Sequence, residues 1–119
     1  MDTQNLFNLS GKTAIITGGG NGIGKASCDI LSAHGANVVI ADLKFDDARA
    51  VSERLNEAGA HALAVSCDVT KDEDLVNLIK STTDEFGSID ILVNNAGGGG
   101  AGRESPYKIS VDDFAWVFK

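Results

Sequence analysis

A glycine-rich turn near the start of the chain has the composition of a phosphate-binding loop. Glycines stand at positions 18, 19, 20, 22 and 24, directly after the apolar run 14–16. Glycine permits backbone conformations with positive φ and lets a ligand approach the backbone closely. N–H groups between a strand and a helix, together with the positive end of the helix dipole, attract a phosphate or pyrophosphate. The stretch 12–24 therefore predicts a nucleotide site.

An aspartate follows this turn at the distance where dinucleotide-binding proteins hold a ribose. Asp42 closes an apolar run about 20 residues further on. Its carboxylate can accept hydrogen bonds from both hydroxyl groups of the adenosine ribose, and it would repel the 2′-phosphate of NADP. The next residue, Leu43, is not an arginine that would offset this charge, and Asn21 is not basic. Lys44 is the one basic residue nearby, and the sequence favours NAD over NADP.

Polar residues also end two further apolar stretches. Asp68 follows the stretch 62–66, and Asn94 with Asn95 follows the stretch 89–93. In parallel sheets covered by helices, ligands bind beyond the carboxyl ends of the strands, where the strand order reverses. The glycine-rich turn, Asp42, Asp68 and Asn94 are therefore expected around one ligand. Asn94 and Asn95 have an equally good structural interpretation, in which their side chains tie neighbouring strands together.

Two other classes of nucleotide site use glycine-rich turns. The phosphate loop of NTPases, G-x-x-x-x-G-K-[ST], fits from Gly19 to Lys25, but Ala26 stands where a magnesium-binding hydroxyl is required. A methyltransferase glycine loop also uses an acidic residue after the second strand, with glycines usually closer together. Both classes remain as less favoured alternatives to a dinucleotide site.

Composition narrows the possible partners. The chain has 119 residues and a formal net charge of −7, which disfavours a nucleic-acid partner. No apolar run approaches the roughly 20 residues of a membrane span, and the first ten residues do not resemble a signal peptide. We therefore expect a cytoplasmic protein. Cys28 and Cys67 lack the spacing of a metal site or disulfide framework, so we predict core thiols and no metal.

The hydrophobic pattern predicts the elements that position these residues. Apolar runs indicate strands at 12–17, 38–40, 62–66 and 89–93, and helical periodicity lies between them. Glycines 35, 59 and 87 are placed to end the helices, and Thr70 with Glu73 resembles a capping box. Another helix start is expected at Ser110 and Asp113. The buried stripe predicted for the first helix comprises Ile23, Ala26, Ser27, Ile30, Leu31 and His34.

Strands that alternate with helices of this length predict βαβ units and a parallel sheet with helices on both faces. We expect a three-layer Rossmann-type α/β fold with strand order 3-2-1-4. Residues 1–119 would form the N-terminal part of a single dinucleotide-binding domain.

Two motifs resemble those of the short-chain dehydrogenase/reductase family. The stretch 17–24 is similar to its T-G-x-x-x-G-x-G motif, and the stretch 94–97 to its N-N-A-G motif. Asp68 and Val69 match the D-V pair after the third strand. The resemblance implies an NAD-binding half of an oxidoreductase that interconverts a secondary alcohol and a ketone. The cofactor-binding residues it implies are Gly18, Asn21, Gly22, Ile23, Gly24, Asp42, Leu43, Asp68, Val69, Asn94, Ala96 and Gly97.

The resemblance also assigns parts of the cofactor to these residues. The glycines and Ile23 would meet the pyrophosphate, Asp42 the adenosine ribose, and Asp68 with Val69 the adenine. Asn94, Ala96 and Gly97 would line the cleft near the ribose. The glycine run that follows Asn95 resembles that of bacterial 7α-hydroxysteroid dehydrogenases, which makes a hydroxysteroid a candidate substrate.

The family's catalytic residues are an Asn, a Ser and a Tyr-x-x-x-Lys. Tyr107 is the one tyrosine, and Val111 stands four places on, so the motif is absent from this sequence. We expect the 119 residues alone to be inactive and the catalytic residues to lie beyond them, in a full-length protein that forms a dimer or tetramer. A nucleotide-binding module without catalysis is the alternative.

Overall fold

The computed structural model describes residues 7–96, in which strands and helices alternate. Gly97, Tyr107 and the helix expected from Ser110 lie outside the described residues. The elements are β1 (Thr13–Thr17), α2 (Gly22–Ala33), β2 (Asn37–Asp42), α3 (Phe45–Glu57), β3 (Ala62–Ser66), α4 (Asp72–Phe86) and β4 (Ile91–Asn94).

The four strands form one parallel sheet in the order β3-β2-β1-β4. This order confirms the predicted Rossmann-type arrangement. It reverses at β1, because β2 and β3 lie on one side of β1 and β4 lies on the other. The register pairs Thr17 with both Ala41 and Asn94, and Asp42 with Ser66. The carboxyl ends of all four strands therefore lie at one edge of the sheet.

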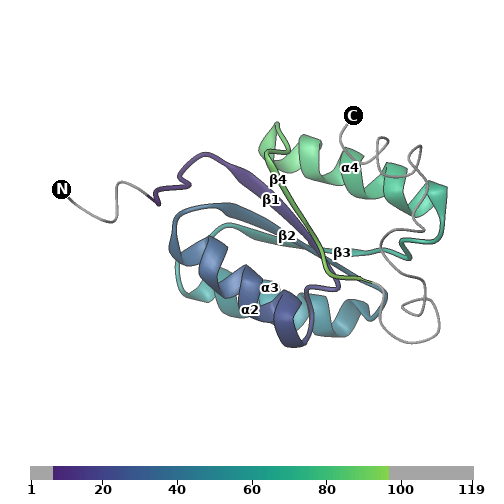
Figure 1. Ribbon diagram of the computed structural model, residues 1–119, viewed down its shortest axis with the longest axis horizontal. Coiled ribbons are helices and arrows are strands. Elements are labelled where there is room, and N and C mark those ends of the chain that lie inside the picture. Colours follow the sequence, from purple (N-terminus) through teal and green to yellow (C-terminus); the bar gives the residue numbers. More distant parts are fainter. Residues whose placement is uncertain (1–6, 97–119) are drawn as a thin grey trace.

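Helices cover both faces of the sheet, as predicted (Figure 1). Helices α2 and α3 lie on one face, and α4 lies on the other. Successive residues of a strand point to opposite faces, so each strand contributes to two cores. Ile16 and Ile40 pack beneath α2 and α3 with Val51 and Leu55. The other core, beneath α4, contains Ile15, Val39, Ala41, Val65, Cys67 and Leu78.

The predicted buried face of α2 is only partly correct, because Leu31 packs against the core but the two isoleucines do not. Ile23 is 75% exposed and Ile30 is 60% exposed, whereas the buried residues of the helix are Gly24 and Cys28. The helix starts so close to the sheet that only small side chains fit beneath its first turns. Its small-residue face therefore packs inward, although its larger apolar residues predicted the opposite.

The capping box predicted at Thr70 is also wrong. Lys71 is the N-cap residue of α4, and no side chain caps that helix. The Thr70 hydroxyl donates instead to Asp68 Oδ1 at 2.6 Å. Threonine side chains often form such local hydrogen bonds in place of a cap. The glycine terminators are confirmed, because Gly35, Gly59 and Gly87 follow the three helices with positive φ.

Helices that could cross a lipid bilayer, judged by length and apolar character, do not occur among residues 7–96.

Candidate functional site

The glycine-rich turn leaves β1 at the point where the strand order reverses. The Gly18 N–H donates to the Ala41 carbonyl at 2.7 Å, which fixes the start of the turn to the end of β2. Gly18 and Gly22 have φ of +66° and +57°, a conformation that side chains rarely adopt. The turn thus reaches α2 in a compact path that requires glycine at these two positions.

Close packing beneath the turn requires glycine at position 24 for a different reason. A Cβ atom there would overlap the Gly18 carbonyl oxygen and would lie 2.8 Å from Asn95 Nδ2. The first turn of α2 therefore lies against the backbone that leaves β1 and against the Asn95 side chain that follows β4. No larger residue allows this approach.

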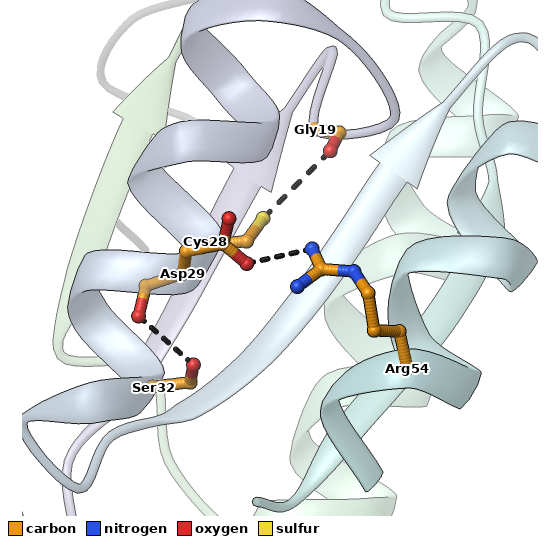
Figure 2. Close-up of polar contacts among 5 residues, drawn as sticks. All are labelled: Gly19, Cys28, Asp29, Ser32 and Arg54. Carbon is orange, nitrogen blue, oxygen red and sulfur yellow. Dashed lines mark hydrogen bonds and ion pairs between the residues drawn. The ribbon is translucent and has the colours of Figure 1, made fainter. Parts of the chain in front are cut away.

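The Cys28 side chain packs against the glycine-rich turn (Figure 2). Its thiol is fully buried and lies 3.8 Å from the Gly19 carbonyl oxygen, to which it donates. Burial raises the pKa of this thiol to about 12, and the nearby Asp29 charge adds to the rise, while Arg54 opposes it. The protonated thiol is a small packing group and a weak donor, as predicted from the sequence. Cys67 is likewise buried, with its pKa raised to about 11 mainly by burial.

An ion pair joins the two helices on this face of the sheet. Figure 2 shows Arg54 of α3 reaching Asp29 of α2, with 2.6 Å between Arg54 Nη2 and Asp29 Oδ1. Both side chains are nearly half exposed, so the pair contributes on the order of 0–1 kcal/mol. It is a contact between α2 and α3, the helix that follows Asp42.

The N-terminus of α2 points its first N–H groups out of the helix without a side-chain cap. The N-cap residue Asn21 makes no capping hydrogen bond. The first turn of any helix has N–H groups without intrahelical partners, and they carry the positive end of the helix dipole. This end of α2, which includes Gly22 and Ile23, has the polarity that binds a diphosphate.

Asp42 contacts the turn directly. Its Oδ2 accepts the Gly20 N–H at 2.9 Å, and its Oδ1 accepts the Lys44 N–H at 2.9 Å. A carboxylate has about four acceptor positions, so two hydrogen bonds leave this group able to accept more. Asp42 is half-buried and Leu43 is 69% exposed, so the carboxylate lies at the rim of the site.

Thr17 joins the turn to the segment after β4, a role that the sequence analysis missed. Its hydroxyl oxygen accepts the N–H groups of Asn95 and Ala96 at 3.0 and 3.1 Å, and it lies 3.1 Å from Asn94 Oδ1. Asn95 Nδ2 donates to the Gly18 carbonyl at 3.3 Å. The asparagine pair therefore ties two strand ends together, as its structural interpretation predicted. A threonine at the end of an otherwise apolar strand was the available signal for Thr17.

Asp68 lies one strand further along the same edge. The preceding residue, Cys67, donates its N–H to the Asp42 carbonyl at 3.1 Å, so Asp68 follows directly beyond Asp42. Asp68 Oδ1 accepts the Thr70 hydroxyl and N–H, and these bonds, the hydroxyl first, hold the pKa of the carboxyl below its usual value. Its other oxygen, Oδ2, makes no such contact within residues 7–96. Val69 packs half-buried against the core beneath α4.

The structure thus brings most predicted site residues to one edge of the sheet. Some of them are joined by hydrogen bonds, and others are only neighbours along that edge. Hydrogen bonds directly join the turn, Asp42 and the Asn94–Ala96 segment. Asp68 and Val69 are adjacent through the sheet. No group of three or more His, Cys, Asp or Glu residues that could hold a metal ion occurs in the described part of the chain.

Comparisons with known proteins agree with this arrangement. The family model of the short chain dehydrogenases matches residues 12–119. The 7α-hydroxysteroid dehydrogenase of Escherichia coli K12 is 42% identical over the whole chain, which covers 46% of that enzyme. Tropinone reductase-like 1 of Erythroxylum coca is 44% identical over 89 residues, or 75% of the chain and 32% of the relative. The chain therefore spans about a third to a half of the length of these relatives.

Solved structures of related dehydrogenases superpose on this chain. A 7α-hydroxysteroid dehydrogenase complexed with NADH and 7-oxoglycochenodeoxycholic acid superposes with a TM-score of 0.78 at 38% identity. The match covers 99% of this chain and 45% of that one. A short-chain type dehydrogenase/reductase from Mycobacterium marinum gives a TM-score of 0.78 at 33% identity over 98% of the chain, and over 47% of its own length.

Proposed function

Because the chain belongs to the short-chain dehydrogenase family, we propose that it forms the NAD(H)-binding part of an oxidoreductase that interconverts a secondary alcohol and a ketone. The observation that carries the proposal is the joining of a glycine-rich turn to the Asp42 carboxylate at the edge where the strand order reverses. This is the place where open parallel sheets bind dinucleotides.

The chemistry of the residues present supports a dinucleotide. The uncapped N-terminus of α2 suits the diphosphate, with Gly22 and Ile23 presenting backbone N–H groups. Gly18 and Gly24 let the turn pack closely enough to expose that backbone. Asp42 retains acceptor positions for the ribose hydroxyls, and the exposed Leu43 beside it offers an apolar contact.

The remaining site residues would hold the adenine and the second ribose. Asp68 would accept from the adenine amino group through its second oxygen, Oδ2, with Val69 beside it. Asn94 and Ala96 would border the cofactor on the β4 side, with Gly97 following them in the sequence. The acidic rim at Asp42 would reject the 2′-phosphate of NADP, so the proposed cofactor is NAD.

The nicotinamide ring, when bound, supplies hydride transfer. Residues 7–96 would bind and orient the cofactor, and proton transfer to the substrate would fall to groups outside them. The Tyr-x-x-x-Lys pattern does not occur in residues 1–119, so we propose that these residues alone do not turn over an alcohol. The similarity to 7α-hydroxysteroid dehydrogenases supports a hydroxysteroid as the substrate class.

A calorimetric titration tests the cofactor assignment. We expect NADH to bind the full natural chain with a Kd below about 0.1 mM, a binding free energy beyond roughly −5.5 kcal/mol. ATP with magnesium and S-adenosylmethionine should bind at least about tenfold more weakly, because the site lacks a magnesium hydroxyl and presents a dinucleotide edge. Tighter binding of either of these two ligands would replace the proposal with an NTPase or a methyltransferase.

The same preparation distinguishes an enzyme from a binding module without catalysis. A 7α-hydroxysteroid is supplied with NAD⁺, with its 7β epimer as the control, and NADH formation is followed by absorbance. Turnover of the 7α alcohol supports the hydroxysteroid assignment. Binding of NADH without turnover of this or other secondary alcohols would favour the module.

A further inference from the structure

A second acidic residue, besides Asp42, contacts the glycine-rich turn. Asp47, in the first turn of α3, accepts a hydrogen bond at 2.8 Å from Asn21 Nδ2, which is 26 residues away in the chain. Asn21 is the N-cap residue of α2, a position where asparagine usually caps the helix with its side-chain oxygen. Here no side-chain cap forms, and the amide reaches across to α3 instead.

Gly20 lies between Asp47 and Asp42. A Cβ atom on Gly20 would lie 2.8 Å from both Asp42 Oδ2 and Asp47 Cβ, and 3.1 Å from the Ala48 nitrogen. Two consecutive residues of the turn therefore donate to two carboxylates, Gly20 to Asp42 and Asn21 to Asp47. One carboxylate comes from the end of β2 and the other from the start of α3, and they flank the same glycine.

We propose that the hydrogen bond between Asn21 and Asp47 stabilises the turn. We further propose that the Asp47 charge is a second determinant of selectivity for NADH over NADPH. The inference rests on the proposed function. In that site the adenosine ribose lies at Asp42, so a 2′-phosphate would approach two negative charges at this corner. Lys44 is the one basic residue within two positions of Asp42 in the sequence, and it is exposed, so water screens it.

Asn21 and Asp47 have separable effects on cofactor binding. The Asp47 charge repels the diphosphate of both cofactors, but it repels a 2′-phosphate only in NADPH, so its removal changes the ratio of the two Kd values. The hydrogen bond from Asn21 acts on the shape of the turn, which both cofactors use. Asn21 is therefore a positioning residue, and Asp47 is both a positioning residue and a selectivity residue.

Three variants of the full natural chain test the proposal by fluorescence titration with NADH and NADPH. Asp47→Asn removes the charge but keeps an oxygen that can accept from Asn21, so the Kd for NADPH should fall roughly fivefold and that for NADH change less than about twofold. Asn21→Ala keeps the Asp47 charge but removes the hydrogen bond between the two residues, so both Kd values should rise roughly threefold to fivefold with their ratio unchanged. Asp46→Asn, the matched control, removes an exposed neighbouring charge and should leave the ratio within about twofold.

The salt dependence supplies an independent readout. The gain of Asp47→Asn in NADPH affinity should shrink between low and high salt, because screening weakens a charge effect at the surface. Two results overturn this inference alone. One is an equal change in the ratio of the NADPH and NADH Kd values for Asp46→Asn and Asp47→Asn. The other is an unchanged ratio in Asp47→Asn while NADH still binds. A wild-type protein that binds neither dinucleotide overturns the proposed function as well.

Discussion

Replacing Gly24 with alanine is expected to lower the free energy of unfolding by more than about 3 kcal/mol. The added Cβ would overlap the Gly18 carbonyl oxygen and press on Asn95 Nδ2, and both belong to the junction between β1, β4 and α2. Neither atom is the free end of a flexible side chain, because Asn95 Nδ2 is itself bonded to the Gly18 carbonyl. Relief requires α2 to move away from the sheet, which separates Cys28 from Gly19.

Gly22→Ala is the matched control within the same turn. Gly22 has φ of +57° and nothing within 4 Å of an added Cβ, so its replacement costs only the strain of a left-handed backbone, about 1–2 kcal/mol. Urea denaturation of the ligand-free protein measures both variants, with far-ultraviolet circular dichroism as the signal. A Gly24→Ala variant as stable as Gly22→Ala would show that α2 does not depend on this close approach.

The double variant Asp42→Ser, Leu43→Arg should reverse the preference for the cofactor. Loss of the carboxylate removes the acceptor for the ribose hydroxyls and frees the Gly20 and Lys44 N–H groups. The Kd for NADH should rise roughly 30-fold, on the scale of one strong charged hydrogen bond. The arginine replaces an exposed side chain and can pair with a 2′-phosphate, so the Kd for NADPH should fall roughly tenfold.

The two single variants separate these effects. Leu43→Arg keeps the carboxylate and should gain less NADPH affinity than the double variant, since Asp42 still repels the phosphate. Asp42→Ser should lose NADH affinity without the gain for NADPH that the arginine provides. Both are measured by kcat/KM and by titration. If the ratio of NADPH to NADH affinity stayed constant in the double variant, Asp42 would not be the residue that holds the ribose.

The sheet and the edge that carries the site could be predicted from local patterns. Short apolar runs that end in Thr17, Asp42 or Asn94 indicate buried parallel strands with polar ends, and the glycines after each helix mark its termination. These signals lie within a few residues of the features they predict. The parallel connection then restricts the topology, which is why the strand order was correct.

The face of α2 and the contacts between distant residues could not be predicted in this way. The periodicity of Ile23 and Ile30 indicates an apolar stripe, but the close approach at Gly24 decides which side of the helix meets the sheet. That constraint depends on the path of the turn in space. The hydrogen bonds that Thr17 accepts from the segment after β4, and the one that Asn21 donates to Asp47, likewise join residues 26 or more positions apart. No local spacing encodes them.

A crystal structure of the full natural chain in complex with NADH would show directly whether the glycine-rich turn and Asp42 hold the cofactor. We predict the diphosphate at the N-terminus of α2, against Gly22 and Ile23, and both hydroxyl oxygens of the adenosine ribose within about 3.2 Å of the Asp42 carboxylate. An NADH molecule bound with its diphosphate away from the glycine-rich turn, or with the adenosine ribose turned away from Asp42, would contradict it.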